Sequence, residues 1–260
     1  MAKATFPNHW LRCYQRRPAA QLRLLCFSYA GGGASVFRTW GEHLPEQVEV
    51  TAVQLPGRED RFREQPFRHL GKLVDALTPI VAEHADIPLA FFGHSMGGLI
   101  VFELTRNLRR TRGPMPKWLF ISARWAPDLP DFLPPIIDLA DSELVRELQD
   151  RYGGFPSAIA ADPDLQALFL PIVRADLELI KSYVYRPELP LDCPISVYGG
   201  LGDAIARSSL AAWRAQTTAA FRLSMLPGDH FYVNAATAAL VRLIATELTE
   251  LWQARRHDET

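Results

Sequence analysis

Short apolar runs alternate along this chain with longer amphipathic stretches. Six runs have the length and composition of buried strands, at residues 22–28, 48–55, 89–92, 118–122, 195–198 and 221–225. In the stretches 70–81 and 96–110, apolar residues recur at helical spacing. Strands that alternate with helices are typical of a parallel sheet with crossover helices. The pattern therefore predicts an α/β fold, with a mostly parallel central sheet flanked by helices.

Two helical patterns carry details of their own. Pro79 lies inside the stretch 70–81 and predicts a kink or an irregular turn, because proline cannot donate the helical hydrogen bond. Near the end of the chain, apolar residues from 233 to 251 fall on one face of a helix. The stretch 232–252 is therefore predicted as a single helix.

Residues 126–190 interrupt the alternation. The segment opens with prolines that exclude a regular element: Pro127, Pro130, Pro134 and Pro135. Helical patterns follow at 142–152 and 164–185, separated by residues 153–156. An insertion near the carboxyl ends of sheet strands is well placed to cover a cleft. We expect a helical lid within a single domain of residues 1–260, and a helical hairpin without function is the alternative.

Composition adds few constraints to this picture. The 260 residues, 48% of them hydrophobic and 22% charged, suit one ordered globular domain. A net charge of -1 gives no reason to expect nucleic acid or a membrane as partner. The three cysteines are far apart and form no metal-binding pattern, so we expect no metal. Residues 1–17 lack the apolar core of a signal peptide, which favours a cytoplasmic protein.

The third apolar run leads into the turn Gly93-His94-Ser95-Met96-Gly97. A sharp strand-to-helix turn of this kind lifts a serine hydroxyl into a cleft, and only glycine fits on both sides of it. The five-residue pattern alone arises easily by chance, but the strand before it and the helix after it favour a nucleophilic Ser95 over an idle one. His94, inside the turn, has the wrong direction to reach that hydroxyl.

A nucleophilic serine needs a base, and the base needs an orienting acid. Among the seven histidines, His230 follows a strand and lies in a loop at its carboxyl end. Asp203 leaves the preceding strand through a glycine-rich turn, and the chain order serine, aspartate, histidine favours it. Asp128 and Asp229 are the competing acids. Asp229 is disfavoured because neighbouring side chains in an extended loop point apart.

The loop after the first strand run contains Ala30 followed by three glycines, which allow close approach of its backbone to a substrate. We expect the N–H groups of Ala30 and Met96 to form an oxyanion hole. A phosphate-binding loop is the rival interpretation, but Val36 stands where a dinucleotide motif places its third glycine. The residues therefore predict an acyl hydrolase, in which an acyl group passes to Ser95 and then to water.

A family resemblance extends over nearly the whole chain. It is carried by Leu25-Cys26-Phe27-Ser28-Tyr29-Ala30-Gly31-Gly32, Gln54-Leu55-Pro56-Gly57-Arg58-Glu59-Asp60-Arg61, Gly93-His94-Ser95-Met96-Gly97-Gly98, Arg174-Ala175-Asp176 and Gly228-Asp229-His230-Phe231. Together these segments resemble the type II thioesterases, the stand-alone editing enzymes of polyketide and non-ribosomal peptide assembly lines. Ser28 departs from the family pattern, which usually has proline there.

The resemblance implies an α/β-hydrolase fold with a mobile helical lid, and it matches Ser95, Asp203 and His230 to the triad. It also implies a substrate acylated on the phosphopantetheine arm of an acyl or peptidyl carrier protein. No cofactor beyond that arm is expected, and we expect a monomer. A carboxylesterase or lipase acting on free esters is one alternative function. A non-catalytic adaptor that binds carrier proteins is another.

Two sets of side chains are each open to two interpretations. Four arginines either attract an acidic carrier protein or form local ion pairs on a solvated loop: Arg58, Arg61, Arg63 and Arg68. Four aromatic residues either line an acyl tunnel or only pack the lid: Phe132, Phe155, Phe169 and Tyr183.

Overall fold

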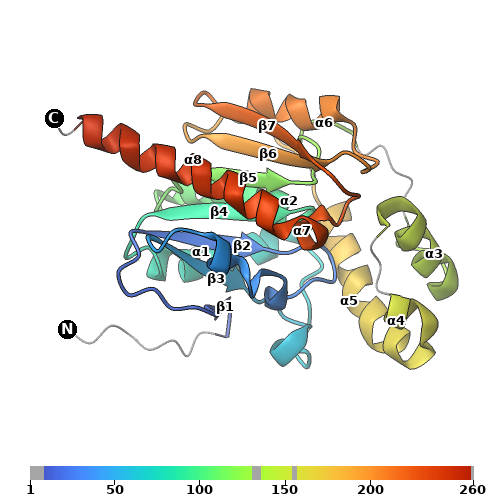
Figure 1. The fold of residues 1–260 in the computed structure, drawn as a ribbon. Coiled ribbons are helices and arrows are strands. Elements are labelled where there is room, and N and C mark those ends of the chain that lie inside the picture. The colour runs from blue at the N-terminus through green and yellow to red at the C-terminus, as the bar shows by residue number, and fades with distance from the viewer. Residues whose placement is uncertain (1–8, 131–135, 154–156, 259–260) are drawn as a thin grey trace.

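The computed structural model describes residues 9–130, 136–153 and 157–258. Its centre is a seven-stranded sheet in the order β1-β3-β2-β4-β5-β6-β7, parallel except for β1 at one edge (Figure 1). The strands are β1 (Leu11–Arg12), β2 (Leu22–Phe27), β3 (Val48–Val53), β4 (Leu89–His94), β5 (Leu119–Ser122), β6 (Ile195–Gly200) and β7 (Phe221–Leu226). The predicted α/β fold is confirmed.

Helices cover both faces of this sheet. The helix α8 (Thr237–Asp258) crosses the front of the sheet in Figure 1, beside the 3-10 helix η2 (Trp40–His43). The helices α1 (Leu70–Glu83) and α2 (Met96–Thr111) pack together, and α2 contacts β2, β4 and β5 on the other face. Every residue of β2, β3, β4, β5 and β6 is buried as a result. This burial explains why apolar residues predominate on both faces of these strands, and the two charged exceptions, Arg23 and Glu49, form a buried ion pair.

The predicted C-terminal helix is wrong in one respect, because the chain breaks it at Ala236. A short helix, α7 (Tyr232–Ala235), precedes α8. The hydroxyl of Thr237 donates to the carbonyl oxygens of Val233 and Asn234, which takes up acceptors at the end of α7. The helix α1 is continuous through Pro79, so the irregular turn predicted there does not form.

In its described residues the insertion forms three helices, which lie beyond the carboxyl ends of the strands at the right of Figure 1. They are α3 (Asp141–Tyr152), α4 (Ser157–Ala161) and α5 (Pro163–Lys181). The pattern predicted α3 and α5 but not α4. Buried side chains from α3 and α5, among them Leu144, Leu148 and Leu170, form a small core separate from that of the sheet.

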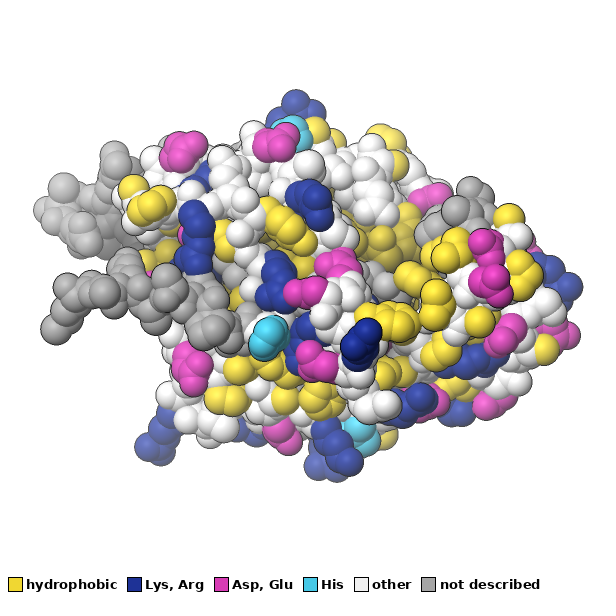
Figure 2. Space-filling view, turned by 90° about the horizontal axis from the view of Figure 1, so that it is seen from below, with side chains coloured by type: hydrophobic (Ala, Val, Ile, Leu, Met, Phe, Trp, Pro, Cys, Tyr) yellow, Lys and Arg dark blue, Asp and Glu magenta, His cyan; other side chains and the backbone are white. Residues whose placement is uncertain are grey.

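Shorter helices connect the remaining segments. They are η1 (Ala34–Phe37), η3 (Glu59–Arg61), α6 (Arg207–Ala211) and η4 (Ala212–Gln216). Charged side chains of both signs are scattered over the face shown in Figure 2, and hydrophobic ones gather toward the insertion. Within the described ranges, no helix has the length and apolar character needed to cross a membrane.

Candidate active site

Ser95 lies in a strained turn between β4 and α2. Its φ of 54° and ψ of -112° are unusual for a residue with a side chain. A Cβ atom at Gly93 would lie 2.1 Å from the carbonyl oxygen of Gly97, and one at Gly97 would lie 2.2 Å from that of Phe27. Both positions therefore require glycine. The Ser95 N–H donates to the carbonyl oxygen of Ser122 at 2.7 Å, which fixes the turn against β5.

The structure places Asp203 against His230. The Nδ1 atom of His230 donates to Oδ2 of Asp203 at 2.9 Å, and both side chains are almost fully buried. The other carboxylate oxygen, Oδ1, accepts the N–H of Ile205 at 3.3 Å. The two side chains come from loops that follow β6 and β7, as the sequence predicts. With Nδ1 carrying the shared proton, Nε2 of a neutral imidazole is left free to accept another.

The competing acids lie elsewhere. Asp128 accepts a hydrogen bond from Nε2 of Gln216 at 3.1 Å, and Asp229 accepts the N–H of Phe231 at 2.8 Å. Asp229 lies next to His230 in the chain, but its carboxylate bonds to the backbone. The carboxylate of Asp203 is therefore the one whose hydrogen bond orients His230.

His94 lies beneath His230 and holds its backbone. Its Nε2 atom is 2.9 Å from the carbonyl oxygen of His230, which can only accept, so Nε2 carries the proton. Nδ1 then accepts from the hydroxyl of Ser122 at 2.8 Å, and that hydroxyl lies 2.5 Å from the hydroxyl of Tyr232. Burial lowers the pKa of His94 well below its usual value, which keeps the ring neutral. The sequence predicts that His94 cannot reach the Ser95 hydroxyl, but it does not predict this buried role.

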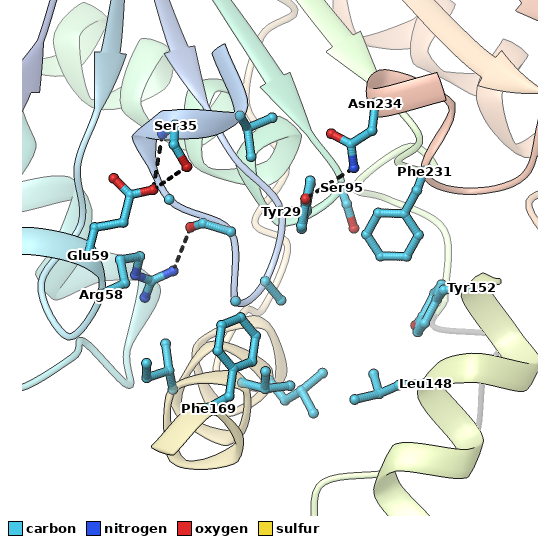
Figure 3. Close-up of a pocket in the computed structure, with 18 of the residues that line it drawn as sticks. Tyr29, Ser35, Arg58, Glu59, Ser95, Leu148, Tyr152, Phe169, Phe231 and Asn234 are labelled. Carbon is cyan, nitrogen blue, oxygen red and sulfur yellow. Dashed lines mark hydrogen bonds between the residues drawn. The ribbon is translucent and has the colours of Figure 1, made fainter. Parts of the chain in front are cut away.

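A cavity of about 520 Å³ opens beside Ser95 and His230. Figure 3 shows Tyr29, Phe231 and Asn234 on the side of the main domain, facing α3 and α5 of the insertion. Side chains of the insertion line the opposite wall: Leu148, Tyr152, Leu168, Phe169, Ile172 and Val173. Because most of these side chains are apolar, the cavity suits an apolar ligand.

A second cavity, of about 690 Å³, also reaches Ser95 and His230. Its walls are more polar, with four charged side chains: Arg124, Asp128, Arg151 and Lys181. Ser95 therefore lies where a mostly apolar space and a more polar one meet. This arrangement suits a substrate with two chemically different arms.

The loop predicted to supply an oxyanion donor borders the first cavity through Ala30, Gly31 and Gly32. The Gly31 N–H donates to Oδ2 of Asp176 at 2.7 Å, and Gly31 has a φ of 80°. Met96, the other predicted donor, is the first residue of α2, where backbone N–H groups have no partner within the helix. Nothing but the backbone is needed for either donor.

A family model described as the thioesterase domain matches residues 22–248. Over 242 residues the chain is 38% identical to the gramicidin S biosynthesis protein GrsT of Aneurinibacillus migulanus, covering 93% of this chain and 94% of GrsT. The chain belongs to the thioesterase family, as a type II thioesterase. Its α/β-hydrolase fold is the one that the resemblance implied.

Solved structures agree with this assignment. The type II thioesterase BorB from the borrelidin biosynthetic cluster matches with a TM-score of 0.83 and 32% identity, over 94% of this chain and all of BorB. RedJ, the thioesterase from the prodiginine pathway of Streptomyces coelicolor, matches with a TM-score of 0.83 and 38% identity. That match covers 89% of this chain and 87% of RedJ.

Of the four arginines predicted either to attract a carrier protein or to form local ion pairs, Arg58 and Arg61 are buried. Arg58 forms a paired ion bridge with Asp176, a partner that neither interpretation of the sequence anticipated. Arg61 bonds to Glu64 and lies over the ring of Trp10, with the guanidinium carbon 4.2 Å from the ring centre. Neither guanidinium is therefore an exposed charge for a carrier protein, and the Arg61–Glu64 pair is a local ion pair of the predicted kind.

The four aromatic residues predicted either to line an acyl tunnel or to pack the lid differ in where they lie. Phe169 lines the first cavity, and Tyr183 lines the second and donates to Glu103 at 3.0 Å. Phe132 and Phe155 lie outside the described residues. Phe169 also packs against the small core of the insertion, so it both packs the insertion and borders the cavity.

Proposed function

We propose that this thioesterase hydrolyses acyl groups from the phosphopantetheine arm of acyl or peptidyl carrier proteins. Ser95 acts as nucleophile, His230 as general base and then acid, and Asp203 orients His230. The observation that carries the proposal is the buried His230–Asp203 hydrogen bond of 2.9 Å, beside a cavity that also reaches Ser95. A base fixed in one tautomer next to a serine is the arrangement that acyl transfer needs.

In the first half-reaction, Nε2 of His230 takes the Ser95 hydroxyl proton while Oγ attacks the thioester carbonyl carbon. The N–H groups of Ala30 and Met96 bind the resulting oxyanion. The intermediate then collapses, the carbon–sulfur bond breaks, and His230 returns the proton to the leaving thiolate. The products are an acyl ester on Ser95 and the free thiol of the carrier arm.

Water completes the reaction. His230 takes a proton from a water molecule, whose oxygen attacks the Ser95 ester, and the same donors bind the second oxyanion. Collapse releases the carboxylic acid, and His230 returns the proton to Oγ of Ser95. The carboxylate of Asp203 stabilises the imidazolium that forms in each half-reaction, and its burial strengthens that effect.

A relative and the lining of the site both support the substrate class. YbtT is a type II thioesterase from the yersiniabactin pathway of non-ribosomal peptide and polyketide biosynthesis, and this chain is 29% identical to it. The mostly apolar first cavity suits an acyl group. We infer an editing role, in which aberrant or stalled acyl groups are removed so that the carrier can be reloaded.

The insertion 126–190 serves as the lid of this site within one domain. Its helices α3 and α5 supply Leu148, Tyr152, Phe169 and Ile172 to the wall of the first cavity. Without these side chains the space beside Ser95 would be open on that side. Enclosure by the lid keeps bulk water from the acyl group during the first half-reaction.

The deciding experiment is mass spectrometry of a panel of acylated carrier proteins exposed to the enzyme, with kcat/KM compared to that on matched oxygen esters. We expect loss of the acyl mass and a preference for the carrier thioester. A clear preference for the free ester would indicate a carboxylesterase instead. Ser95→Ala is the control, and an unchanged rate in that variant would remove the catalytic assignment.

A further inference from the structure

One face of helix α5 lies on the loop that carries Ala30. Phe169, Val173 and Asp176 are spaced four and three residues apart, so they share this face. A Cβ atom built on Gly31 would lie 3.1 Å from both Phe169 and Val173. Helix and loop are therefore in close contact, and a side chain at Gly31 would crowd both.

The carboxylate of Asp176 forms the polar part of this contact. Its Oδ2 atom accepts the Gly31 N–H at 2.7 Å and a guanidinium N–H of Arg58 at 2.8 Å. Oδ1 accepts the second guanidinium nitrogen at 2.8 Å. Only 1% of the Asp176 side chain and 4% of the Arg58 side chain is exposed. Buried charges are costly unless paired, so each of these two charges depends on the other to stay buried.

Arg58 extends the same network along the loop. Its Nη1 atom also donates to the carbonyl oxygen of Gly32 at 3.2 Å. The backbone oxygen of Arg58 accepts from Nε2 of Gln54 at 2.9 Å, and the other end of that amide accepts the Ala34 N–H at 2.8 Å. Hydrogen bonds therefore hold the loop at Gly31, Gly32 and Ala34.

We propose that Asp176, held in place by Arg58, is a positioning residue for the oxyanion loop. By fixing the peptide between Ala30 and Gly31, it restricts rotation at Ala30 and keeps the Ala30 N–H directed at the cavity. This inference rests on the proposed function, because it takes Ala30 as an oxyanion donor. It also makes the aim of that donor depend on a helix of the insertion.

The expected effect follows from the geometry. Asp176→Asn keeps the shape of the side chain but replaces one of its two acceptor oxygens with a donor, so the Gly31 N–H and the two guanidinium nitrogens of Arg58 can no longer all be satisfied. Removing an oxyanion donor outright costs about 10²–10³ in kcat, and a misplacement of about 1 Å costs about 10². We expect kcat to fall by about 10- to 100-fold, with KM changed by less than about threefold.

The test compares two substrates, p-nitrophenyl acetate and an acylated carrier protein. The small ester needs neither a docked carrier nor a lid wall, but its hydrolysis passes through the same oxyanions. A loosened donor therefore lowers kcat on both substrates by similar factors. A fall confined to the carrier substrate would show that Asp176 acts only through the lid, and this would overturn the proposal.

Glu178→Gln is the matched control on the same helix. Glu178 also forms an ion pair, with Arg68, but both side chains are partly exposed and neither is hydrogen-bonded to the loop. We expect kcat within about twofold of the parent, since exposed ion pairs contribute little. A loss equal to that of Asp176→Asn would mean that any disturbance of α5 suffices, which contradicts a specific role for Asp176.

A double variant separates activity from stability. Removing one partner of a buried pair strongly destabilises a protein, whereas replacing both with apolar residues is often neutral. Arg58→Met with Asp176→Leu should therefore recover most of the melting temperature lost in Asp176→Leu. Its kcat should stay low, because the Gly31 N–H still lacks its acceptor. Recovery of kcat together with the melting temperature would reduce Asp176 to a structural role.

The same preparations keep this proposal separate from the proposed function. If the parent enzyme shows no preference for carrier thioesters, the substrate class fails, yet the ratio of Asp176→Asn to parent on p-nitrophenyl acetate still tests the positioning role. A ratio within threefold of unity in folded protein overturns the positioning role, whatever the substrate preference.

Discussion

Replacing His94 with phenylalanine tests the buried network beneath His230. The change keeps a ring where His94 packs against Tyr29 and Tyr232, with centroids 5.8 and 5.5 Å away, but removes both nitrogens. The His230 carbonyl then loses its donor and the Ser122 hydroxyl loses an acceptor. Each buried polar group left without a partner costs about 1–3 kcal/mol, so we expect the variant to be about 2–6 kcal/mol less stable at pH 7.5.

That difference in stability should shrink in acid, for a reason specific to His94. Its pKa is lowered in the folded protein from an ordinary value of 6.5, so the unfolded chain binds the proton more readily. The parent therefore loses stability as pH falls through 6.5, and the phenylalanine variant does not lose this contribution. With the folded ring still neutral at pH 5.0, linkage gives a loss of about 2 kcal/mol between pH 7.5 and 5.0.

The measurement is urea unfolding followed by tryptophan fluorescence at pH 7.5, 6.5, 5.5 and 5.0, for parent and variant. The difference in free energy of unfolding should narrow by up to about 2 kcal/mol across the series. Tyr232→Phe is the control, because it removes a hydroxyl from the network and leaves His94 in place. It should keep the pH dependence of the parent. A difference that stays constant or widens toward pH 5.0 for His94→Phe would refute the argument.

Three further changes test the site itself. Gly97→Ala places a methyl group 2.2 Å from a backbone oxygen and should abolish folding in thermal melts, whereas Gly98→Ala meets no atom closer than 3.2 Å and should fold. Asp203→Asn should lower kcat by about 10⁴ in ester hydrolysis, because the histidine tautomer is lost, and Asp128→Asn by less than about threefold. Ile172→Phe narrows the first cavity, so kcat/KM measured over a series of chain lengths should move toward shorter acyl groups.

Six of the seven described strands could be predicted from sequence, because β2 to β7 consist mainly of apolar residues and β2 to β6 are buried along their whole length. The missing strand, β1, has two residues and pairs only at the sheet edge, and so short a segment has no period to detect. The break at Ala236 was also missed. The apolar residues keep their helical spacing across the break, so the pattern carries no sign of it.

The candidate site likewise contains residues that the sequence predicts and one whose role it does not. Ser95, Asp203 and His230 each follow a strand, so the parallel sheet brings them to one edge whatever the rest of the chain does. His94 was recognised only as pointing away from the serine. The hydrogen bond between His94 and the His230 carbonyl joins residues 136 positions apart, and no local sequence pattern predicts it.

Arg58 shows most clearly why local patterns fail here. It begins the run Arg58-Glu59-Asp60-Arg61, whose neighbouring charges of both signs are typical of a solvated loop. Its guanidinium is buried because Asp176, 118 positions away on a helix of the insertion, meets it with both carboxylate oxygens. An arginine is hidden only where a partner neutralises it, and the partner is set by the tertiary fold. An acidic residue elsewhere on α5 therefore cannot replace Asp176, because the carboxylate that neutralises Arg58 is also the acceptor of the Gly31 N–H.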